Sequence, residues 1–459
     1  MIEKEYSSFR DPSGFVYKEQ GVVFRQVNKL YLDKFEHMHS SGLYEKLVAE
    51  DMIIKHVKVK EEADYTIIKP EKVPFISYPY EWSFSQLKDA AITTLKLHKQ
   101  AMSFGMLMKD ANAFNIQFVN SKPKLIDTLS FDFYNEGEPW VAYGQFCSHF
   151  LAPLFLMAEV DIRMSQMLRM NIDGIPIDLA SKLLEKKRKF AIKQHIHWHA
   201  KSVTKHATDG KAIKGKPIKS IKISKFNHIA TINSLIKIVS KLKLKYVSTE
   251  WMNYYQNTNY TDKAFGSKSY IVTEYMKKIS PEIIWDLGAN NGTFSRLALK
   301  AGVKSVIAFD IDPLAVEKNY LMTKKHSESI LPLLLDLTNP SPALGFNNAE
   351  RLPIGDRSKP DCILALALIH HLCISKNIPF DMVAESFASQ SDKLIIEFIP
   401  KEDSQVEVLL ATRDDIFFHY NQDEFEKAFS RYYDIIELSK VEDSDRTLFL
   451  MNRRENIET

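Results

Sequence analysis

Two aspartates with a glycine-containing loop between them have the spacing of a nucleoside-binding site. Asp286 ends an apolar run, 283–285, and the loop 288–292 (Gly-Ala-Asn-Asn-Gly) follows. Asp310 lies 24 residues after Asp286 and ends a second apolar run, 305–309. Glycine lets the backbone approach a ligand because it has no Cβ, and a carboxylate accepts hydrogen bonds from vicinal ribose hydroxyls. The pattern predicts a strand–loop–helix–strand unit that binds an adenosine-containing cofactor.

The glycine spacing also limits the class of cofactor. A dinucleotide-binding loop needs glycines in the spacing G-x-G-x-x-G, and the second and third places hold Asn290 and Thr293. The pyrophosphate cradle is therefore incomplete, which argues against NAD.

The motif D-L-G-A-N-N-G, followed by F-D-I-D-P-L-A-V-E-K-N, resembles the class I methyltransferases that use S-adenosylmethionine. The resemblance covers residues 250 to 455. It implies that Asp286, Gly288 and Gly292 face the methionyl part of the cofactor and that Asp310 faces the ribose. The other residues that it assigns to the cofactor are Asn290, Ile311, Asp336, Tyr260 and Lys268.

Further apolar runs predict the rest of an α/β sheet. They span 331–336, 362–369 and 393–399, and the segment 381–390 between the last two is helix-like, as alternation of strands and helices requires. The strands expected at 433–438 and 446–451 are too close in sequence for a helical crossover, so they should pair antiparallel. A parallel sheet closed by an antiparallel C-terminal hairpin is the shape that the methyltransferase resemblance implies.

The loop after the fourth strand bears on the methyl acceptor. Methyltransferases that act on exocyclic or amide nitrogens carry (N/D)-P-P-(Y/F) there, whereas this chain has His370 and His371. The departure argues against DNA adenine, glutamine and RNA guanine as acceptors. Histidine can remove a hydroxyl or carbon-acid proton near neutral pH. We therefore predict His371, with His370 as second candidate, as general base in O- or C-methylation of a small-molecule or glycan/lipid-type acceptor. The alternative is that at least one histidine only caps the strand.

A second pattern lies in the N-terminal part. Asp110 is followed after five residues by Asn115 and after twelve more by Asp127, behind a helix-like segment at 84–104. Kinases and aminoglycoside-type phosphotransferases have their catalytic Asp, Asn and metal-holding Asp in this order, and residues 1 to 200 resemble them. The departures are the absence of G-x-G-x-x-G, the three equally eligible strand lysines Lys55, Lys58 and Lys69, and the residues Lys109, Thr128 and Leu129 beside the two aspartates.

Three interpretations of this part stay open. It is a degenerate kinase-like domain used for binding, a live phosphotransferase, or an α/β domain in which the spacing is coincidental.

Charge is distributed unevenly along the chain. The net charge is +3, yet residues 186–245 hold 17 Lys or Arg and one acid, Asp209. Within this band, 201–225 has eight Lys, two Gly and one Pro but no aromatic residue. Such a segment is typical of a solvated linker or exposed hairpin. The alternative is a surface for a polyanion such as nucleic acid, anionic lipid or acidic glycan.

Other residue types narrow the class of protein. Three cysteines exclude a disulfide framework and a Cys-rich zinc site. His195, His197 and His199 have no nearby carboxylate or cysteine, so we expect surface or core histidines and no metal. The N-terminus lacks the apolar core of a signal peptide, and the most apolar stretch, 150–158, is too short to span a bilayer. A cytoplasmic protein is expected.

These observations predict three regions. An α+β domain that resembles kinases occupies 1–200, a lysine-rich linker or hairpin 201–245, and a Rossmann-like methyltransferase domain 246–459. The alternatives to small-molecule methylation are RNA methylation, with 186–245 holding the RNA, and a scaffold that keeps the cofactor fold without catalysis.

Overall fold

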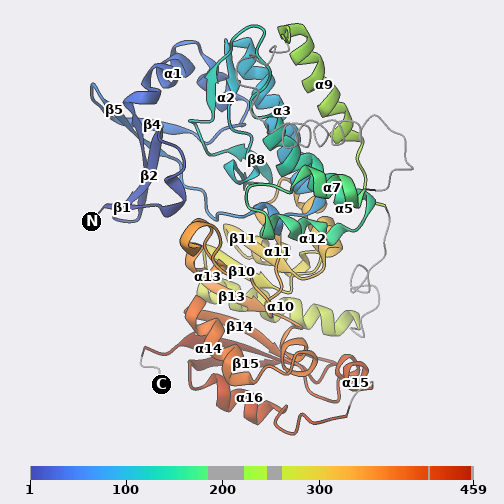
Figure 1. Cartoon of the computed structure of the whole chain (residues 1–459). Coiled ribbons are helices and arrows are strands. Elements are labelled where there is room, and N and C mark those ends of the chain that lie inside the picture. Colours follow the sequence, from blue (N-terminus) through green and yellow to red (C-terminus); the bar gives the residue numbers. More distant parts are fainter. Residues whose placement is uncertain (1, 185–221, 246–260, 412–413, 456–459) are drawn as a thin grey trace. The chain divides into compact units, whose positions relative to one another are not determined.

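The computed structural model describes the chain except for residues 1, 185–221, 246–260, 412–413 and 456–459. Two compact units are present (Figure 1). Unit 1 comprises Met1–Tyr246 and Ala343–Arg351, and unit 2 comprises Val247–Pro342 and Leu352–Thr459. His195, His197 and His199, together with most of the lysine-rich band, lie outside the described residues.

Unit 1 begins with a five-stranded antiparallel sheet of order β1-β2-β3-β5-β4. Its strands are β1 (Ile2–Lys4), β2 (Gly14–Glu19), β3 (Val22–Asn28), β4 (His56–Glu61) and β5 (Tyr65–Pro70). Helices α1 (Lys29–Ser40) and α2 (Leu43–Ala49) connect β3 to β4. Val27, Tyr31, Phe35, Ile68 and Leu129 form one hydrophobic cluster, so α1 packs on the sheet face that carries Val27.

The remainder of unit 1 is mainly helical. Helix α3 (Phe84–Ser103) begins at a capping box, in which the Ser83 hydroxyl accepts from the Gln86 backbone N–H and the Gln86 side chain accepts in return. The short strands that follow α3 are β6 (Met106–Met108), β7 (Ile116–Val119), β8 (Lys122–Leu125) and β9 (Phe131–Phe133). The next helices are α4 (Tyr143–Phe146), α5 (Ala152–Glu159), α6 (Met167–Met170) and α7 (Ile177–Leu183).

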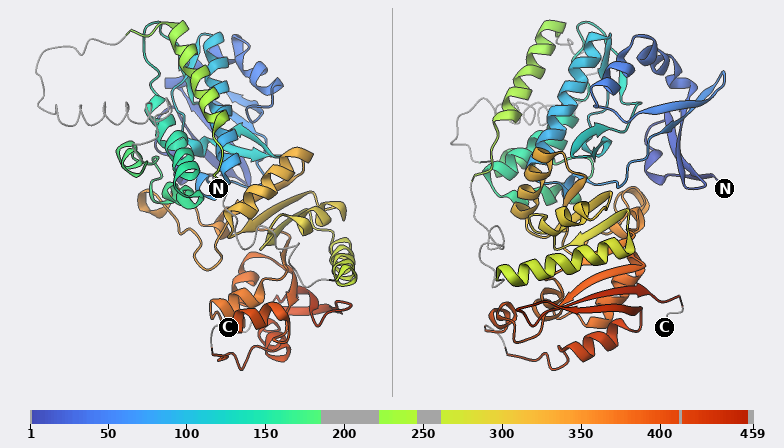
Figure 2. Two further views of the ribbon diagram at one scale, coloured as in Figure 1. Left: turned by 90° about the vertical axis from the view of Figure 1, so that its right-hand side faces the viewer. Right: turned by 180° about the vertical axis from the view of Figure 1, so that it is seen from behind.

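Part of the span for which we predicted a linker or hairpin is a helix instead. Helix α9 (Lys225–Lys241) has Ser224 as N-cap and buries His228, Ile232, Leu235 and Val239. These four residues recur at helical spacing, and they form an apolar face among the lysines. Helix α9 lies beside α3 (Figures 1 and 2). The Nε2 atoms of His98 and His228 are 3.1 Å apart.

Unit 2 contains a seven-stranded sheet of order β12-β11-β10-β13-β14-β16-β15. Its strands are β10 (Ile283–Leu287), β11 (Ser305–Asp310), β12 (Ile330–Leu334), β13 (Cys362–Ala365), β14 (Lys393–Phe398), β15 (Tyr433–Lys440) and β16 (Thr447–Arg453). The first five pair in parallel, and β16 is antiparallel to both β14 and β15. The predicted class I methyltransferase sheet, closed by an antiparallel C-terminal hairpin, is confirmed.

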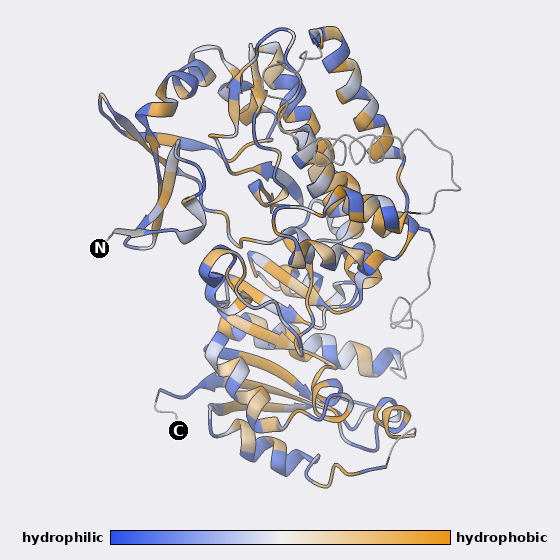
Figure 3. Ribbon diagram, viewed as in Figure 1, coloured by the Kyte–Doolittle hydropathy of each residue, from blue (hydrophilic) through white to orange (hydrophobic). Residues whose placement is uncertain are grey.

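Helices cover both faces of this sheet. They are α10 (Asp262–Ile279), α11 (Thr293–Lys300), α12 (Pro313–His326), α13 (Ile354–Arg357), α14 (Phe380–Gln390), α15 (Ser404–Leu410) and α16 (Gln422–Phe429). Helix α10 lies along one face (Figure 2), where Val272 and Met276 pack with Ile284 and Leu450. On the other face, Phe425 of α16 contacts Phe449. Because both faces are covered, the central strands are mostly apolar (Figure 3).

One short segment between β12 and β13 belongs to unit 1. Arg10 donates from Nε and Nη2 to the two carboxylate oxygens of Glu350, at 2.7 and 2.8 Å. The Glu350 side chain is 1% exposed, and the Arg10 hydrogen bond lowers its pKa. The chain therefore leaves the sheet after β12, contributes 343–351 to unit 1, and returns for β13.

Candidate functional site

The site predicted for the cofactor lies at the carboxyl edge of the unit 2 sheet. From β10 the chain runs outward through β11 to β12 and then returns to β13 on the other side of β10. In an open α/β sheet this reversal leaves a crevice beyond the carboxyl ends of the two central strands, and ligands bind there. Residues 288–292, which follow β10, and residues 366–371, which follow β13, lie at this edge of the sheet.

The loop after β10 folds over the end of β11. The N–H groups of Gly288 and Ala289 both donate to the Phe309 carbonyl at 2.9 Å. Gly288 has φ +78°, and a Cβ there would meet only the Leu368 side chain, at 3.5 Å. A left-handed backbone with free space beside it is where a ligand can approach the main chain.

The glycine at position 292 is explained by packing inside the protein. It also has a left-handed φ, +79°, but a Cβ would collide with the side chains of Asn319 and Arg296. The glycine is therefore required by packing between α11 and α12. Its predicted contact with the cofactor stays a prediction.

Asp310 is placed to receive a ligand. Its Oδ2 accepts from the Asn290 backbone N–H at 2.7 Å and its Oδ1 from that of Asp312 at 2.8 Å. Burial raises the pKa of Asp310 to about 6, and the two backbone donors limit the rise. Within the described residues Asp310 has no ion-pair partner, so its charge is compensated by N–H dipoles alone.

Asp286 is more deeply placed and makes a hydrogen bond inside the protein. Asp286 is 2% exposed, and its Oδ2 accepts a hydrogen bond from the Ser295 hydroxyl at 2.5 Å. Burial raises the pKa of Asp286 to about 7, and the charge of Asp310 adds to the rise. The two acids therefore share one low-dielectric environment at the ends of β10 and β11.

Lys268 of α10 reaches the same edge but is already paired. Its ammonium donates to Glu397 Oε2 at 2.6 Å, with side-chain exposures of 2% and 0%, and it lies 4.9 Å from the ring centroid of Phe294. Burial lowers the pKa of Lys268, whereas Glu397 opposes that effect. Sequence reasoning proposed Lys268 for the cofactor and missed this partner.

Glu397 links Lys268 to the loop that carries the histidines. Its Oε2 also accepts from the backbone N–H of Ala367 at 2.7 Å, a residue with left-handed φ of +49°. On the other side, Arg446 lies 3.8 Å from Glu397 Oε1 and donates twice to Asp403, at 2.7 and 3.0 Å. Two buried cations and two carboxylates thus neutralise each other beneath the histidine loop.

His370 and His371 occupy different environments. His370 is fully buried, and neither ring nitrogen has a hydrogen-bond partner among the described residues. His371 is partly exposed, and its ring centroid lies 4.1 Å from that of His370. Burial, followed by the charge of Arg446, lowers the pKa of His371 to about 4. Both imidazoles are therefore neutral at neutral pH, and a neutral imidazole can accept a proton.

The remaining predicted residues are more peripheral. Ile311, next to Asp310, is 54% exposed and offers an apolar surface at the crevice. Asp336 lies just beyond β12, where its Oδ1 accepts from the backbone N–H and the hydroxyl of Thr338. Tyr260 lies outside the described residues.

One sequence signal could have revealed the missed group. Glu397 stands in the run Lys-Leu-Ile-Ile-Glu-Phe-Ile at 393–399, and an acid inside a strand buried on both faces needs a partner. The identity of that partner was not accessible, because Lys268 and Arg446 lie far from Glu397 in sequence.

The second predicted pattern is brought together in unit 1. Asn115 Nδ2 donates to Asp110 Oδ2 at 3.0 Å, and the Ser130 hydroxyl donates to Asp127 Oδ2 at 2.7 Å. Arg25 of β3 lies 2.5 Å from Asp127 Oδ1. Among the three candidate lysines, Lys58 of β4 pairs with Glu36 of α1 at 2.9 Å. The kinase-like interpretation stays a prediction.

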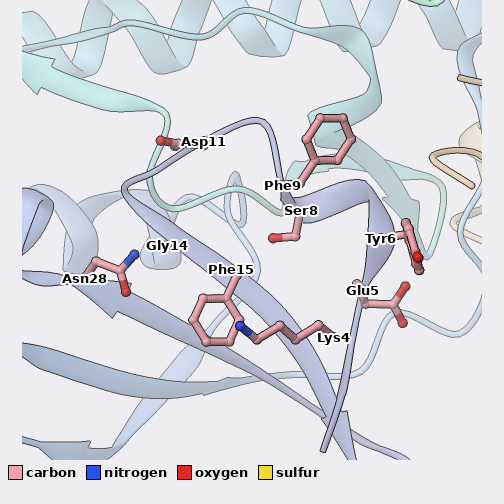
Figure 4. A pocket seen from close by; sticks show the side chains of 9 residues that line it. All are labelled: Lys4, Glu5, Tyr6, Ser8, Phe9, Asp11, Gly14, Phe15 and Asn28. Carbon is pink, nitrogen blue, oxygen red and sulfur yellow. The ribbon is translucent and has the colours of Figure 1, made fainter. Parts of the chain in front are cut away.

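A pocket in unit 1 lies apart from this cluster. Lys4, Phe15 and Asn28 are among the residues that line it (Figure 4). Phe15 pairs with Gln26, whereas Val16 pairs with Arg25. Since successive residues of a strand face opposite sides, the pocket and Arg25 lie on opposite faces of the sheet.

The described residues contain neither a metal-binding cluster nor a membrane-spanning helix. No group of three or more His, Cys, Asp or Glu side chains is arranged to hold a metal ion. No helix in the described ranges has the length and apolar character needed to cross a membrane. Cys147, Cys362 and Cys373 are buried and unbridged.

Comparison with known proteins gives one full-length relative. Nodulation protein NoeA of Rhizobium meliloti (strain 1021) is 34% identical over 458 residues, which cover 98% of this chain and 96% of that protein. No family model matches the chain.

Two solved structures illustrate the structural matches. N-methyltransferase NodS from Bradyrhizobium japonicum WM9 has 10% identity, covers 42% of this chain and 98% of its own, and has a TM-score of 0.32. Magnesium protoporphyrin IX methyltransferase from Synechocystis PCC 6803, with bound SAH, has 15% identity, covers 44% and 93%, and has a TM-score of 0.32. The assignment of the fold depends on the strand order rather than on these matches.

Proposed function

The chain belongs to the family of the nodulation protein NoeA, and we propose that it is an S-adenosylmethionine-dependent methyltransferase. The observation that carries the proposal is the junction of β10 and β11. There a Cβ at Gly288 would meet only the Leu368 side chain, at 3.5 Å, without a clash, and the Asp310 carboxylate, without an ion-pair partner among the described residues, stands at the end of the adjacent strand.

The residues at this edge suit the cofactor. Asp310 would accept hydrogen bonds from the ribose hydroxyls, because each carboxylate oxygen has a lone pair beyond the one used by a backbone N–H. Ile311 offers an apolar surface for the adenine, with Asp336 beyond it. The loop 286–292 would border the methionyl part, together with Lys268. When bound, S-adenosylmethionine would supply a methyl group activated by a sulfonium centre.

Histidine chemistry then limits the acceptor. A neutral His371 can take the proton of a hydroxyl or an acidic C–H group on an imidazole nitrogen. Burial, followed by the charge of Arg446, keeps that imidazole neutral by lowering its pKa. Glu397 holds the loop by accepting the Ala367 N–H. We therefore propose O- or C-methylation of a small-molecule or glycan/lipid-type acceptor. By analogy with the name of the relative, we propose that this methylation serves nodulation.

The test begins with the cofactor. Calorimetry on the full chain should show S-adenosylmethionine binding that Asp310→Ala weakens by about 2–3 kcal/mol, the value of hydrogen bonds to a charged group. Asp392→Ala is the matched control, because Asp392 is exposed and pairs with Arg453 at the opposite edge of the sheet. Unchanged affinity in Asp310→Ala would remove the ribose assignment.

The acceptor requires a separate experiment. Purified protein is incubated with radiolabelled S-adenosylmethionine and cell extract divided into lipid, glycan, small-molecule, RNA and protein fractions. Label in the lipid, glycan or small-molecule fraction is expected. Label confined to RNA would favour RNA methylation, and cofactor binding without transfer to any fraction would favour a scaffold.

A further inference from the structure

Two buried histidines connect helix α9 to helix α3 in unit 1, and the methyltransferase proposal does not use them. His98 of α3 is 0% exposed, and His228 of α9 is 4% exposed. Their Nε2 atoms are 3.1 Å apart. At this distance one ring nitrogen donates a proton and the other accepts it. The contact between the helices therefore depends on where the ring protons lie.

The backbone determines which ring is the donor. The Met108 N–H donates to His98 Nδ1 at 3.0 Å, so this nitrogen presents its lone pair. A neutral imidazole carries one ring proton, and in His98 that proton is consequently on Nε2. The ring of His98 also stacks on Trp140, with 4.2 Å between the centroids. His98 is thus the donor of the pair, and His228 Nε2 is the acceptor.

The acceptor role leaves His228 no room for a second proton. With Nε2 as acceptor, neutral His228 carries its proton on Nδ1, which is buried without a hydrogen-bond partner among the described residues. A second proton would go to Nε2, because this is the remaining lone pair of the ring. Two N–H groups would then face each other across 3.1 Å. The docked helix therefore excludes the protonated form of His228.

The charged groups around this junction make other contacts. From α3, Lys99 donates to the Asn233 side chain and Lys88 donates to the Leu242 carbonyl, each at 2.9 Å. Beyond β9, Glu136 accepts from the Lys225 backbone N–H and from the Tyr134 hydroxyl. Burial lowers the pKa of His228, and it lowers the pKa of His98 to about 3.

We propose that the His98–His228 pair is a proton-sensitive latch, which holds α9 on α3 while His228 is neutral and releases the helix when His228 takes up a proton. After release, His98 still accepts from the Met108 N–H, so each helix released takes up one proton. Release uncovers Ile232, Leu235 and Val239, the apolar face of α9. Acid thus converts a docked helix into a free amphipathic one.

The direction of the pH dependence follows from this difference. In the released helix, His228 has the ordinary histidine pKa near 6.5, whereas the docked helix does not accept the proton. Docking is therefore at full strength above about pH 7. It weakens as the pH falls below about 6.5, by about tenfold per pH unit, because one proton is taken up.

Hydrogen exchange of the full chain tests the latch without any substitution. Protection factors, which correct for the intrinsic effect of pH on exchange, should fall about 20- to 30-fold for the α9 amides between pH 7 and pH 5. The α3 amides should keep their protection over the same range. Unchanged protection of α9 in the unmodified protein would overturn the proposal.

A substitution identifies the group that takes up the proton. In His228→Gln, the amide oxygen can accept from His98 Nε2 but does not titrate, so α9 should stay protected down to pH 5. His326→Gln is the matched control, since this histidine of α12 is exposed, and it should retain the fall. A fall that persists in His228→Gln would assign the effect to another group and contradict the proposal.

Acid unfolding of unit 1 is distinguished by the other amides. Unit 1 contains a second histidine pair, His39 and His56, whose Nε2 atoms are 3.4 Å apart. Protonation there would act on α1 and β4 rather than on α9 alone. Equal loss of protection in α1, α3 and α9 would mean that the whole unit opens, and the latch would be rejected.

Discussion

Asp310 in unit 2 and Asp127 in unit 1 are aspartates at or just beyond the end of a strand, and they differ in how their charge is compensated. Asp310 accepts two backbone N–H groups and has no ion-pair partner among the described residues. Asp127 accepts the Leu129 N–H at 3.1 Å and is also paired with Arg25. A carboxylate compensated only by backbone dipoles can still bind the hydrogen-bond donors of a ligand. A carboxylate that is already paired with a guanidinium has less affinity for such donors.

The glycines beside the two aspartates differ in the same way. Gly288 has free space where a Cβ would stand, with only the Leu368 side chain in contact range. At Gly14 in unit 1, a Cβ would collide with the Gln26 carbonyl and would lie 2.8 Å from Leu129 Cδ1. One glycine leaves room for a ligand, and the other lets two parts of the protein meet.

The largest effect is expected from filling the open space. Gly288→Val should abolish S-adenosylmethionine binding, because its side chain would occupy the position from which a ligand contacts the backbone. Gly302→Val is the matched control, since Gly302 also has a positive φ, +107°, with nothing near its Cβ position. Both variants carry backbone strain, but only the first should lose binding in calorimetry. Equal loss in both would attribute the effect to strain.

The sequence predicted the strands that carry the aspartates of unit 2 but not the residues that pair across the fold. The apolar runs around Asp286 and Asp310 predicted β10, β11 and the loop between them, because the signal is local. The identity of residues that pair across the fold had no local signal. Arg25 meets Asp127, and Lys268 meets Glu397, through packing of segments that lie far apart along the chain. The sequence therefore indicated which aspartates stand at strand ends and could not show which one is already neutralised.

The second expected effect concerns the chemical step. His371→Ala should lower turnover about 10²–10⁴-fold without change in cofactor affinity, if His371 is the base. Burial lowers the pKa of His371 to about 4, so its titration should not change turnover between about pH 6 and 8. A histidine with the ordinary pKa, near 6.5, would instead make turnover rise with pH in this range. The exposed His326 serves as control in His326→Ala.

A different result would reassign His371. Normal turnover per folded molecule, combined with reduced stability in urea unfolding, would make it a structural residue. Positioning alone would then carry the reaction, and an acceptor that is already ionised would be favoured.

A smaller effect is expected from pH. Cofactor hydroxyls hydrogen-bond best to ionised Asp310, whose pKa burial raises to about 6. Affinity should therefore be constant above about pH 7 and fall by up to about tenfold per unit below pH 6. The stability of the free protein changes with pH in the opposite direction. Burial favours the protonated form of Asp310, so this contribution to stability is present at low pH and is lost as the pH rises through about 6.

Asp310→Asn separates this acid from its neighbour. The variant should bind more weakly and show no fall in affinity near pH 6 in calorimetry. A fall that persists in Asp310→Asn would belong to Asp286, whose pKa is about 7.

The smallest effect on methyl transfer is expected in unit 1. Asp127→Asn should leave turnover within about twofold of the unmodified protein, since its carboxylate contacts unit 1 residues and takes no part in the proposed reaction. Stability should nevertheless fall by about 1–3 kcal/mol, because Arg25 would remain buried without its counter-ion. Urea unfolding and methyl transfer per folded molecule measure the two quantities, with Asp161→Asn as control, since its partner Arg163 is exposed. Mg-ATP should produce no thermal shift in the unmodified protein, because the guanidinium already holds Asp127. A magnesium-dependent shift that disappears in Asp127→Asn would instead identify a live phosphotransferase, and the contrast between an open and a closed aspartate would fail.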